Sequence, residues 1–153
     1  MAERHRGVAG VNFPVYKRYD EELTQLRSAI RALCKRFNLV FVFGSNLAGA
    51  HGAGAALEAA DHFGAEMGVG EGPTGQAYAL PTKDEHIETL PPEEIIISVE
   101  NFLEYAELHP ELTFFVTRVG CGLAGLKEED IAPLFADAPE NCILPEGWRH
   151  AAE

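Results

Sequence analysis

Leu39-Val-Phe-Val-Phe-Gly-Ser-Asn-Leu-Ala-Gly-Ala-His-Gly-Ala-Gly54 joins a short apolar run to a glycine-rich segment. The apolar run, Leu39–Phe43, is typical of a strand that is buried on both faces of a parallel sheet. Gly44–Gly54 is then expected to form a loop. A helix is predicted from about Ala53 to Phe63, and Gly64 is suited to end it. A strand, a loop and a helix in this order predict the first unit of an α/β fold.

The segments on either side repeat this alternation of helices and strands. A basic and apolar segment upstream predicts a helix, because its leucines and isoleucine fall at helical spacing after the capping residue Asp20. Downstream, Pro91-Pro92 suits a helix start. Helices are expected at Asp20–Arg36, Pro91–Leu108 and Glu128–Phe135, strands at Gln76–Leu80, Leu112–Thr117 and Asn141–Leu144, and a glycine-rich loop over residues 64–75. This order predicts an α/β fold with a mostly parallel central sheet that helices cover on both faces.

Length, charge and cysteine content limit the class of protein. The 153 residues suit one domain, expected to span residues 20–153 after an irregular arm of residues 1–19. A formal charge of −12 argues against binding to nucleic acid or anionic membranes. Eight of the cations lie in the first 36 residues, so a basic N-terminal face is the alternative to a mixed, solvated helix face. Three cysteines, with no apolar run of about 20 residues, predict a cytoplasmic protein without a membrane span.

A second glycine-rich loop, Gly120-Cys-Gly-Leu-Ala-Gly125, follows the strand expected at Leu112–Thr117. Ligands of open α/β sheets bind at the carboxyl ends of the strands, where both loops are expected. Glycines let several N–H groups point at one anion, and the helix expected after the first loop adds its positive N-terminal end. Asn46 offers an amide that suits ribose hydroxyls. Neither loop has the sequence of a P-loop or of a dinucleotide-binding fingerprint, so tight turns remain the alternative.

Other reactive side chains are predicted near the same edge. Lys83 follows the second strand and could neutralise a phosphate, attack a sugar carbon or remain solvated. Cys121 and His51 could form a nucleophilic pair, but a cysteine within a phosphate-cradling loop favours a backbone role. The histidines and cysteines show no metal-ligand spacing, and no metal or cofactor is expected.

Two stretches of the sequence resemble the two ligand loops of macrodomains: Ser45-Asn-Leu-Ala-Gly-Ala-His-Gly-Ala-Gly-Ala-Ala56 and Arg118-Val-Gly-Cys-Gly-Leu-Ala-Gly-Leu126. The resemblance covers residues 40–144 and is closest to the terminal ADP-ribose protein glycohydrolase branch and to macro-like proteins of phages and bacteria. It implies a three-layer α/β/α macro-like fold that binds ADP-ribose. The ligand-binding residues that the likeness and the loops together predict are Gly44, Ser45, Asn46, Gly52, Ala53, Gly54, Gly120, Cys121, Gly122, Leu123, Ala124 and Gly125.

The resemblance also bears on catalysis. In the glycohydrolase branch a lysine attacks the terminal ribose and an acid of the second loop resolves the adduct. Lys83 falls on the lysine's position, but Ala124 stands where the acid is expected. Several hypotheses therefore stay open. Another acid or base, namely His51, Asp84 or Asp130, could complete the reaction, or the domain could hydrolyse ADP-ribose-1″-phosphate instead. Alternatively, it binds ADP-ribose without catalysis, or it is a phage- or defence-related interaction protein that uses the fold as a scaffold.

Overall fold

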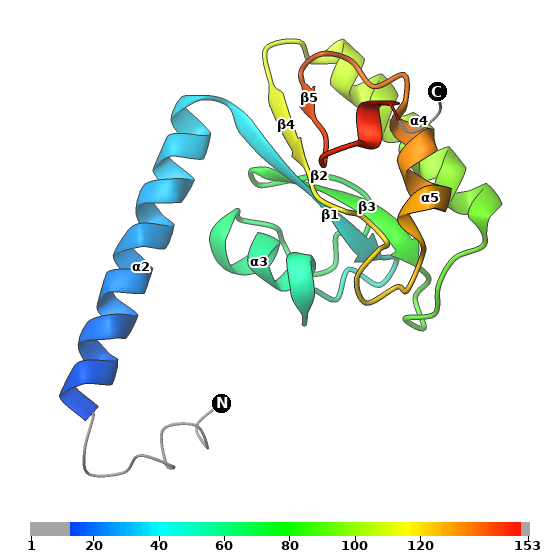
Figure 1. Ribbon diagram of the computed structural model, residues 1–153. Helices are drawn as coiled ribbons and strands as arrows, with labels where there is room; N and C mark the ends of the chain where they lie inside the picture. The colour runs from blue at the N-terminus through cyan, green and yellow to red at the C-terminus, as the bar shows by residue number, and fades with distance from the viewer. Residues whose placement is uncertain (1–12, 151–153) are drawn as a thin grey trace.

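The computed structural model describes the backbone of residues 13–150 and the side chains of residues 21–150 (Figure 1). The first helix of the described residues, α2, spans Phe13–Arg36. It begins earlier than predicted, so residues 13–19 are helical and Asp20 lies inside the helix. Pro14 is compatible with this earlier start, because a proline in the first turn of a helix costs no hydrogen bond. Residues 1–12 of the expected arm lie outside the described residues.

A five-stranded sheet forms the centre of the molecule, with the order β2-β3-β1-β4-β5. β1 pairs in parallel with β3 and β4, and β4 pairs in parallel with β5. β2 pairs antiparallel with β3 at one edge, inside the segment that was predicted to be a loop. The strands are β1 Leu39–Asn46, β2 Gly72–Thr74, β3 Ala77–Lys83, β4 Thr113–Val116 and β5 Cys142–Ile143. The prediction of an α/β fold with a mostly parallel sheet is therefore confirmed.

The two central strands are longer than predicted at their carboxyl ends. β1 continues through Gly44, Ser45 and Asn46, which were expected to begin the first loop. They are held in the strand because they pair with the end of β3, where Asn46 stands opposite Lys83. The first loop therefore starts at Leu47, and the strands carry polar side chains directly to the edge of the sheet.

The remaining helices lie close to their predicted positions. α3 spans Gly54–His62, and Gly64 follows it with a φ of +75°, in the left-handed conformation typical of a glycine after a helix. α4 spans Pro92–Leu108. The helix predicted at residues 128–135 is divided into α5 (Glu128–Ile131) and the 3₁₀ helix η1 (Ala132–Phe135), and a further 3₁₀ turn, η2 (Trp148–His150), follows β5. No helix within residues 13–150 is long and apolar enough to cross a membrane.

Each face of the sheet has its own apolar cluster. In β1 the buried side chains alternate, so that Val42 and Phe43 point to opposite faces. The larger cluster contains Val42 and packs against α4, with Phe102 fully buried at its centre. The smaller cluster contains Phe43 and packs against α3. Helices thus cover both faces of the sheet, but to different extents.

The α3 face of the sheet is covered only in part. Phe115 of β4 is 50% exposed and Ile143 of β5 is 48% exposed, and both belong to strands beyond the reach of the nine-residue helix α3. β4 is therefore buried on one face only, although its sequence is apolar on both. Figure 1 shows the cause: α2 leads away from the sheet and leaves β4 and β5 uncovered on this side.

Candidate functional site

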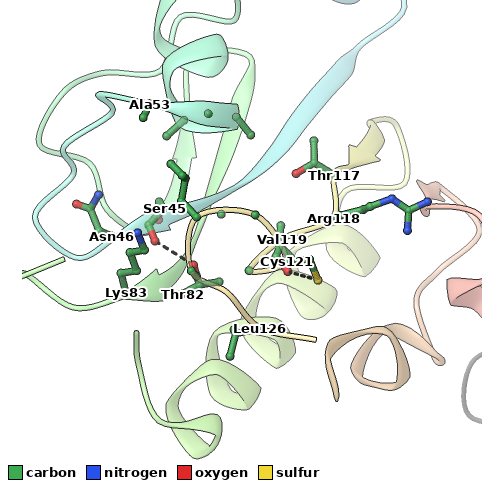
Figure 2. A pocket seen from close by; sticks show the side chains of 18 of the residues that line it. Ser45, Asn46, Ala53, Thr82, Lys83, Thr117, Arg118, Val119, Cys121 and Leu126 are labelled. Carbon is green, nitrogen blue, oxygen red and sulfur yellow. Dashed lines mark hydrogen bonds between the residues drawn. The ribbon is translucent and has the colours of Figure 1, made fainter. Parts of the chain in front are cut away.

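A cavity of about 1050 Å³ opens at the carboxyl ends of β1, β3 and β4 (Figure 2). Its walls are the end of β1, the start of α3, the loop after β4 and the start of α5. The predicted residues that line it are Gly44, Ser45, Asn46, Gly52, Ala53, Gly54, Lys83, Gly120, Cys121, Gly122, Leu123 and Ala124. The structure therefore brings both glycine-rich segments to one cavity.

The start of α3 presents unpaired N–H groups to this cavity. The first N–H groups of a helix have no partner within the helix and are commonly capped by a side chain. The capping residue here is Ala53, which has no side chain able to do so. Within residues 13–150, the N–H groups of Gly52, Ala53 and Gly54 donate to no protein acceptor. An uncapped helix start of this kind favours an anion.

The second loop is held in shape by its own backbone and by the turn before α4. The Leu126 N–H donates to the Gly120 carbonyl at 2.8 Å, which closes the loop. The Thr89 hydroxyl donates to the Ala124 carbonyl at 2.9 Å and ties the loop to the neighbouring turn. These hydrogen bonds hold the second loop in place, and none of them involves the N–H groups near the tip of the loop.

Those N–H groups are the second set of free donors at the cavity. Gly122, Leu123 and Ala124 donate to no acceptor among the residues that the structure describes. Successive N–H groups in a glycine-rich turn form a concave site for an anionic oxygen. The two sets of donors face a common cavity, so a ligand with two phosphates could be held from both sides.

Gly44 is the point where the two walls of the cavity meet. A Cβ atom at this residue would stand 3.2 Å from the Gly120 nitrogen, closer than side chains normally approach a backbone atom. A side chain at residue 44 would therefore push the second loop away from β1. By contrast, a Cβ atom at Gly52 or Gly122 would meet no other atom within 4 Å, because both residues border open space.

Three cations line the cavity of this acidic chain. Lys127 lies 3.9 Å from the exposed Glu129, and Arg118 forms an ion pair with Glu128. Lys83 is half-buried at the end of β3 beside Asn46, and no acidic group of the described residues pairs with it. Figure 2 shows Lys83 on the β1 side of the second loop and Arg118 beyond it. The positive charge is thus spread along the cavity.

Asn46 shapes the first loop rather than presenting its amide to the cavity. The side-chain oxygen accepts the Ala50 N–H at 2.9 Å, and the side-chain nitrogen donates to the Ala50 carbonyl at 2.7 Å. The Ser45 hydroxyl likewise donates to the Gly70 carbonyl. Both residues line the cavity, but their polar groups stabilise the chain that forms its wall.

His51 does not reach the cavity. It is only 2% exposed, its Nε2 lies 3.0 Å from the Glu66 carbonyl oxygen, and its ring meets the Phe43 ring edge-on at 5.2 Å between centroids. The first loop turns at Asn46 so that His51 points into the smaller apolar cluster. This placement corrects its prediction as an acid or base at the mouth of the loop.

Asp84, Asp130 and Gly125 also lie outside the lining of the cavity. The Asp84 carboxylate accepts the N–H groups of His86 and Glu88 at 2.8 and 3.0 Å, so it stabilises the turn after β3. The Glu88 N–H above all, and then that of His86, hold the pKa of the Asp84 carboxyl below its ordinary value. Because this carboxylate lies outside the cavity lining and is held by the N–H groups of its own turn, the prediction of Asp84 as catalytic has no support in this geometry.

The Cys121 thiol is unsuited to nucleophilic attack. Burial raises its pKa, and the nearby Glu128 carboxylate raises it further, against the opposing effect of Arg118. The thiol donates weakly to the Val119 carbonyl at 3.5 Å. These contacts favour the backbone role that the sequence indicated.

Several cavity residues were missed from the sequence. Arg118 lies in the quoted second motif, but only the glycines after it were assigned a role. Its position directly after a buried strand is the signal that could have identified it, as for Lys83. Glu128 and Thr82 gave no such signal, because a helix start rich in acids and a threonine within a strand are common in any α/β protein.

No protein-family model, curated protein or solved structure matches this chain. Within the described part of the chain, no group of three or more histidine, cysteine or acidic side chains is placed to hold a metal ion. Function must therefore be argued from the cavity itself.

Proposed function

We propose that this domain binds ADP-ribose, or a closely related phosphorylated nucleotide, in the cavity between its two glycine-rich segments. The observation that carries the proposal is the double set of unpaired N–H groups, at Gly52–Gly54 and at Gly122–Ala124, that border one cavity. A diphosphate offers enough anionic oxygens to occupy both sets. Each charge-assisted hydrogen bond of this kind is stronger than a neutral one.

Charge and size agree with this ligand. The chain carries a formal charge of −12, and Glu128 and Glu129 line the cavity beside Arg118 and Lys127. Lys83 lines the same cavity without an acidic partner among the described residues, and an unpaired cation in an acidic protein attracts anions to that place. The volume of about 1050 Å³ is at the upper end of ordinary ligand pockets, which suits a ligand with two sugars and a base.

The likeness to macrodomains adds a fold and a reaction to the proposal. The sheet with helices on both faces is compatible with a three-layer α/β/α macro-like domain, in which the second loop would wrap the diphosphate. Hydrolysis of an ADP-ribosyl conjugate or of ADP-ribose-1″-phosphate is the second candidate function, and it is favoured by Lys83 at the cavity wall. His51 and Asp84 lie elsewhere, so binding is better supported than turnover, and a reader without catalysis is the main alternative.

Calorimetric titration with ADP-ribose tests the binding proposal. We expect saturable binding by the natural chain and its loss in Gly122→Glu, because the new carboxylate would occupy the space where a phosphate is expected and repel it. Gly122→Ala is the matched control. Its methyl group meets no atom within 4 Å, so binding should persist.

Both variants should keep the circular dichroism and the unfolding temperature of the natural chain, since residue 122 borders open space. Absence of heat and of thermal stabilisation at roughly 1 mM ADP-ribose, a concentration that detects even weak binding, would overturn the proposal. Equal binding by Gly122→Glu and Gly122→Ala would place the ligand outside this cavity.

A further inference from the structure

An apolar stripe runs along α2 and remains exposed. Leucine, isoleucine and phenylalanine recur at alternating intervals of three and four residues: Leu23, Leu26, Ile30, Leu33 and Phe37. The last four are between 40% and 58% exposed. Alternating intervals of three and four are the heptad repeat of a coiled coil, in which the stripe is the seam between two helices.

The opposite side of α2 faces the rest of the domain. Thr24, Arg27, Ser28 and Arg31 line a polar hollow of about 280 Å³ together with Asp61 and His62 at the end of α3. On a helix of 3.6 residues per turn, these positions lie away from the centre of the apolar stripe. Contact with the domain thus uses the polar side, and the stripe from Leu26 to Phe37 stays exposed, with the Arg36 guanidinium 5.4 Å from the centre of the Phe37 ring.

We propose that the stripe pairs with α2 of a second copy of this chain in a parallel, two-stranded coiled coil. In the heptad repeat, Leu23, Ile30 and Phe37 take the a positions, and Leu26 and Leu33 take the d positions. Leucine stands at both of these d positions and the β-branched Ile30 at the middle a position, a combination that favours two parallel strands. In the sequence the same intervals continue upstream at Tyr16 and Tyr19, so the repeat covers three heptads.

Charges beside the seam select the parallel arrangement. Glu22 takes a g position and Arg27 the following e position, so in a parallel pair each Glu22 meets Arg27 of the partner helix, twice by symmetry. In an antiparallel pair with the same core, Arg27 would face its own copy and repel it. The stripe is also narrow, because its large apolar side chains stand only at the a and d positions and the apolar residues beside them, Ala29 and Cys34, are small; a narrow stripe fits a helix better than a broad sheet.

The second possible cover for the stripe is the exposed part of the chain's own sheet, at Phe115 and Ile143. In the structure neither surface covers the other, since Phe115, Ile143 and the stripe from Leu26 to Phe37 are all 40% exposed or more. A chain that closed on itself would remain a monomer, so measurement of the mass in solution separates the two arrangements.

Sedimentation equilibrium of the full chain tests the proposal. We expect twice the mass of one chain for the natural sequence. The double substitution Leu26→Asp with Leu33→Asp puts two charges into the seam and should give a monomer. Gln25→Asp with Ala32→Asp is the matched control, because it adds the same charges to the same helix at exposed c positions and should leave the dimer intact.

Charge exchange tests the orientation. Arg27→Glu alone and Glu22→Arg alone should each weaken dimerisation roughly tenfold, since each replaces two attractive pairs by two repulsive ones. The combination Glu22→Arg with Arg27→Glu should restore the affinity. In an antiparallel pair the combined variant would place the two new carboxylates at position 27 opposite each other. It would also place the new guanidinium at position 22 near Arg36 of the partner helix. Both contacts are repulsive, so the dimer affinity would not be restored.

A monomer at roughly 100 μM natural chain, well above the micromolar range of an ordinary interface, overturns the proposal. An unchanged mass in the seam variant overturns it equally. Both outcomes are independent of ADP-ribose binding, because none of the described side chains of α2 lines the cavity of the proposed nucleotide site.

Discussion

At the scale of single residues, Lys83 and His51 show how packing decides a role. The sequence offered both as catalytic groups at one sheet edge. β3 carries Lys83 to the cavity wall, where it is half-buried. The turn at Asn46 instead directs His51 inward, against Phe43 and the Glu66 carbonyl. The two side chains should therefore fail in different ways when they are removed.

Replacement of each by alanine separates the roles. Lys83→Ala should weaken ADP-ribose binding about tenfold, the worth of one charged hydrogen bond, and leave the free energy of unfolding nearly unchanged. His51→Ala should lower the free energy of unfolding by about 2–4 kcal/mol, because it leaves a cavity in the core, while the folded fraction keeps its affinity. Urea denaturation and titration calorimetry measure the two quantities. If His51→Ala loses ADP-ribose binding but keeps its free energy of unfolding, His51 acts in the binding site and its structural role is wrong.

At the scale of elements, a contact between α5 and η2 connects the cavity with the end of the described chain. Glu128 accepts a hydrogen bond from the Trp148 ring nitrogen at 2.9 Å and pairs with Arg118. Trp148 is 2% exposed and packs against Phe135. The Trp148 hydrogen bond above all, and then Arg118, lower the pKa of Glu128. The contact therefore depends on an ionised carboxylate.

This dependence predicts an effect of pH on stability. Because the folded-state pKa is lowered, the stabilisation by Glu128 is present above the ordinary glutamate value of about 4.3 and is lost as the pH falls through the folded-state value. Glu128→Gln should thus be less stable than the natural chain near neutral pH, and the difference should shrink in acid. Trp148 is the only tryptophan, so its fluorescence can follow urea unfolding between about pH 3 and 7. A difference that is constant with pH would contradict this role.

Most elements could be predicted from the sequence, because their signals are local. The Pro91-Pro92 start of α4 and the apolar runs of β1 and β4 locate these elements to within a few residues. β2 was missed since Gly72-Pro-Thr74 has no strand pattern and is held only by pairing with β3. The glycine segments and Lys83 were found from their order after strands, whereas the burial of His51 depends on tertiary packing that no local pattern encodes.

At the scale of the whole molecule, the two faces of the sheet differ in how much apolar surface they bury. Phe114 and Phe115 are neighbours in β4 and point to opposite faces. Phe114 is fully buried and lies edge-on to Phe102, with 5.4 Å between ring centroids. Phe115 is 50% exposed and stacks loosely on Phe41 at 6.4 Å. These two phenylalanines on one strand therefore allow the burial on the two faces of the sheet to be compared.

Replacement of each phenylalanine by alanine measures the difference between the faces. Phe114→Ala should lower the free energy of unfolding by about 4 kcal/mol, as expected for a fully buried ring. Phe115→Ala should lower it by no more than about 1 kcal/mol, since half of its surface already meets water. Urea unfolding of the seam variant Leu26→Asp with Leu33→Asp, which should be monomeric, gives both values without a contribution from association. If Phe115→Ala proves as costly as Phe114→Ala in the natural chain but not in the seam variant, the stripe of α2 covers this face of the sheet, and the pairing of two α2 helices is wrong.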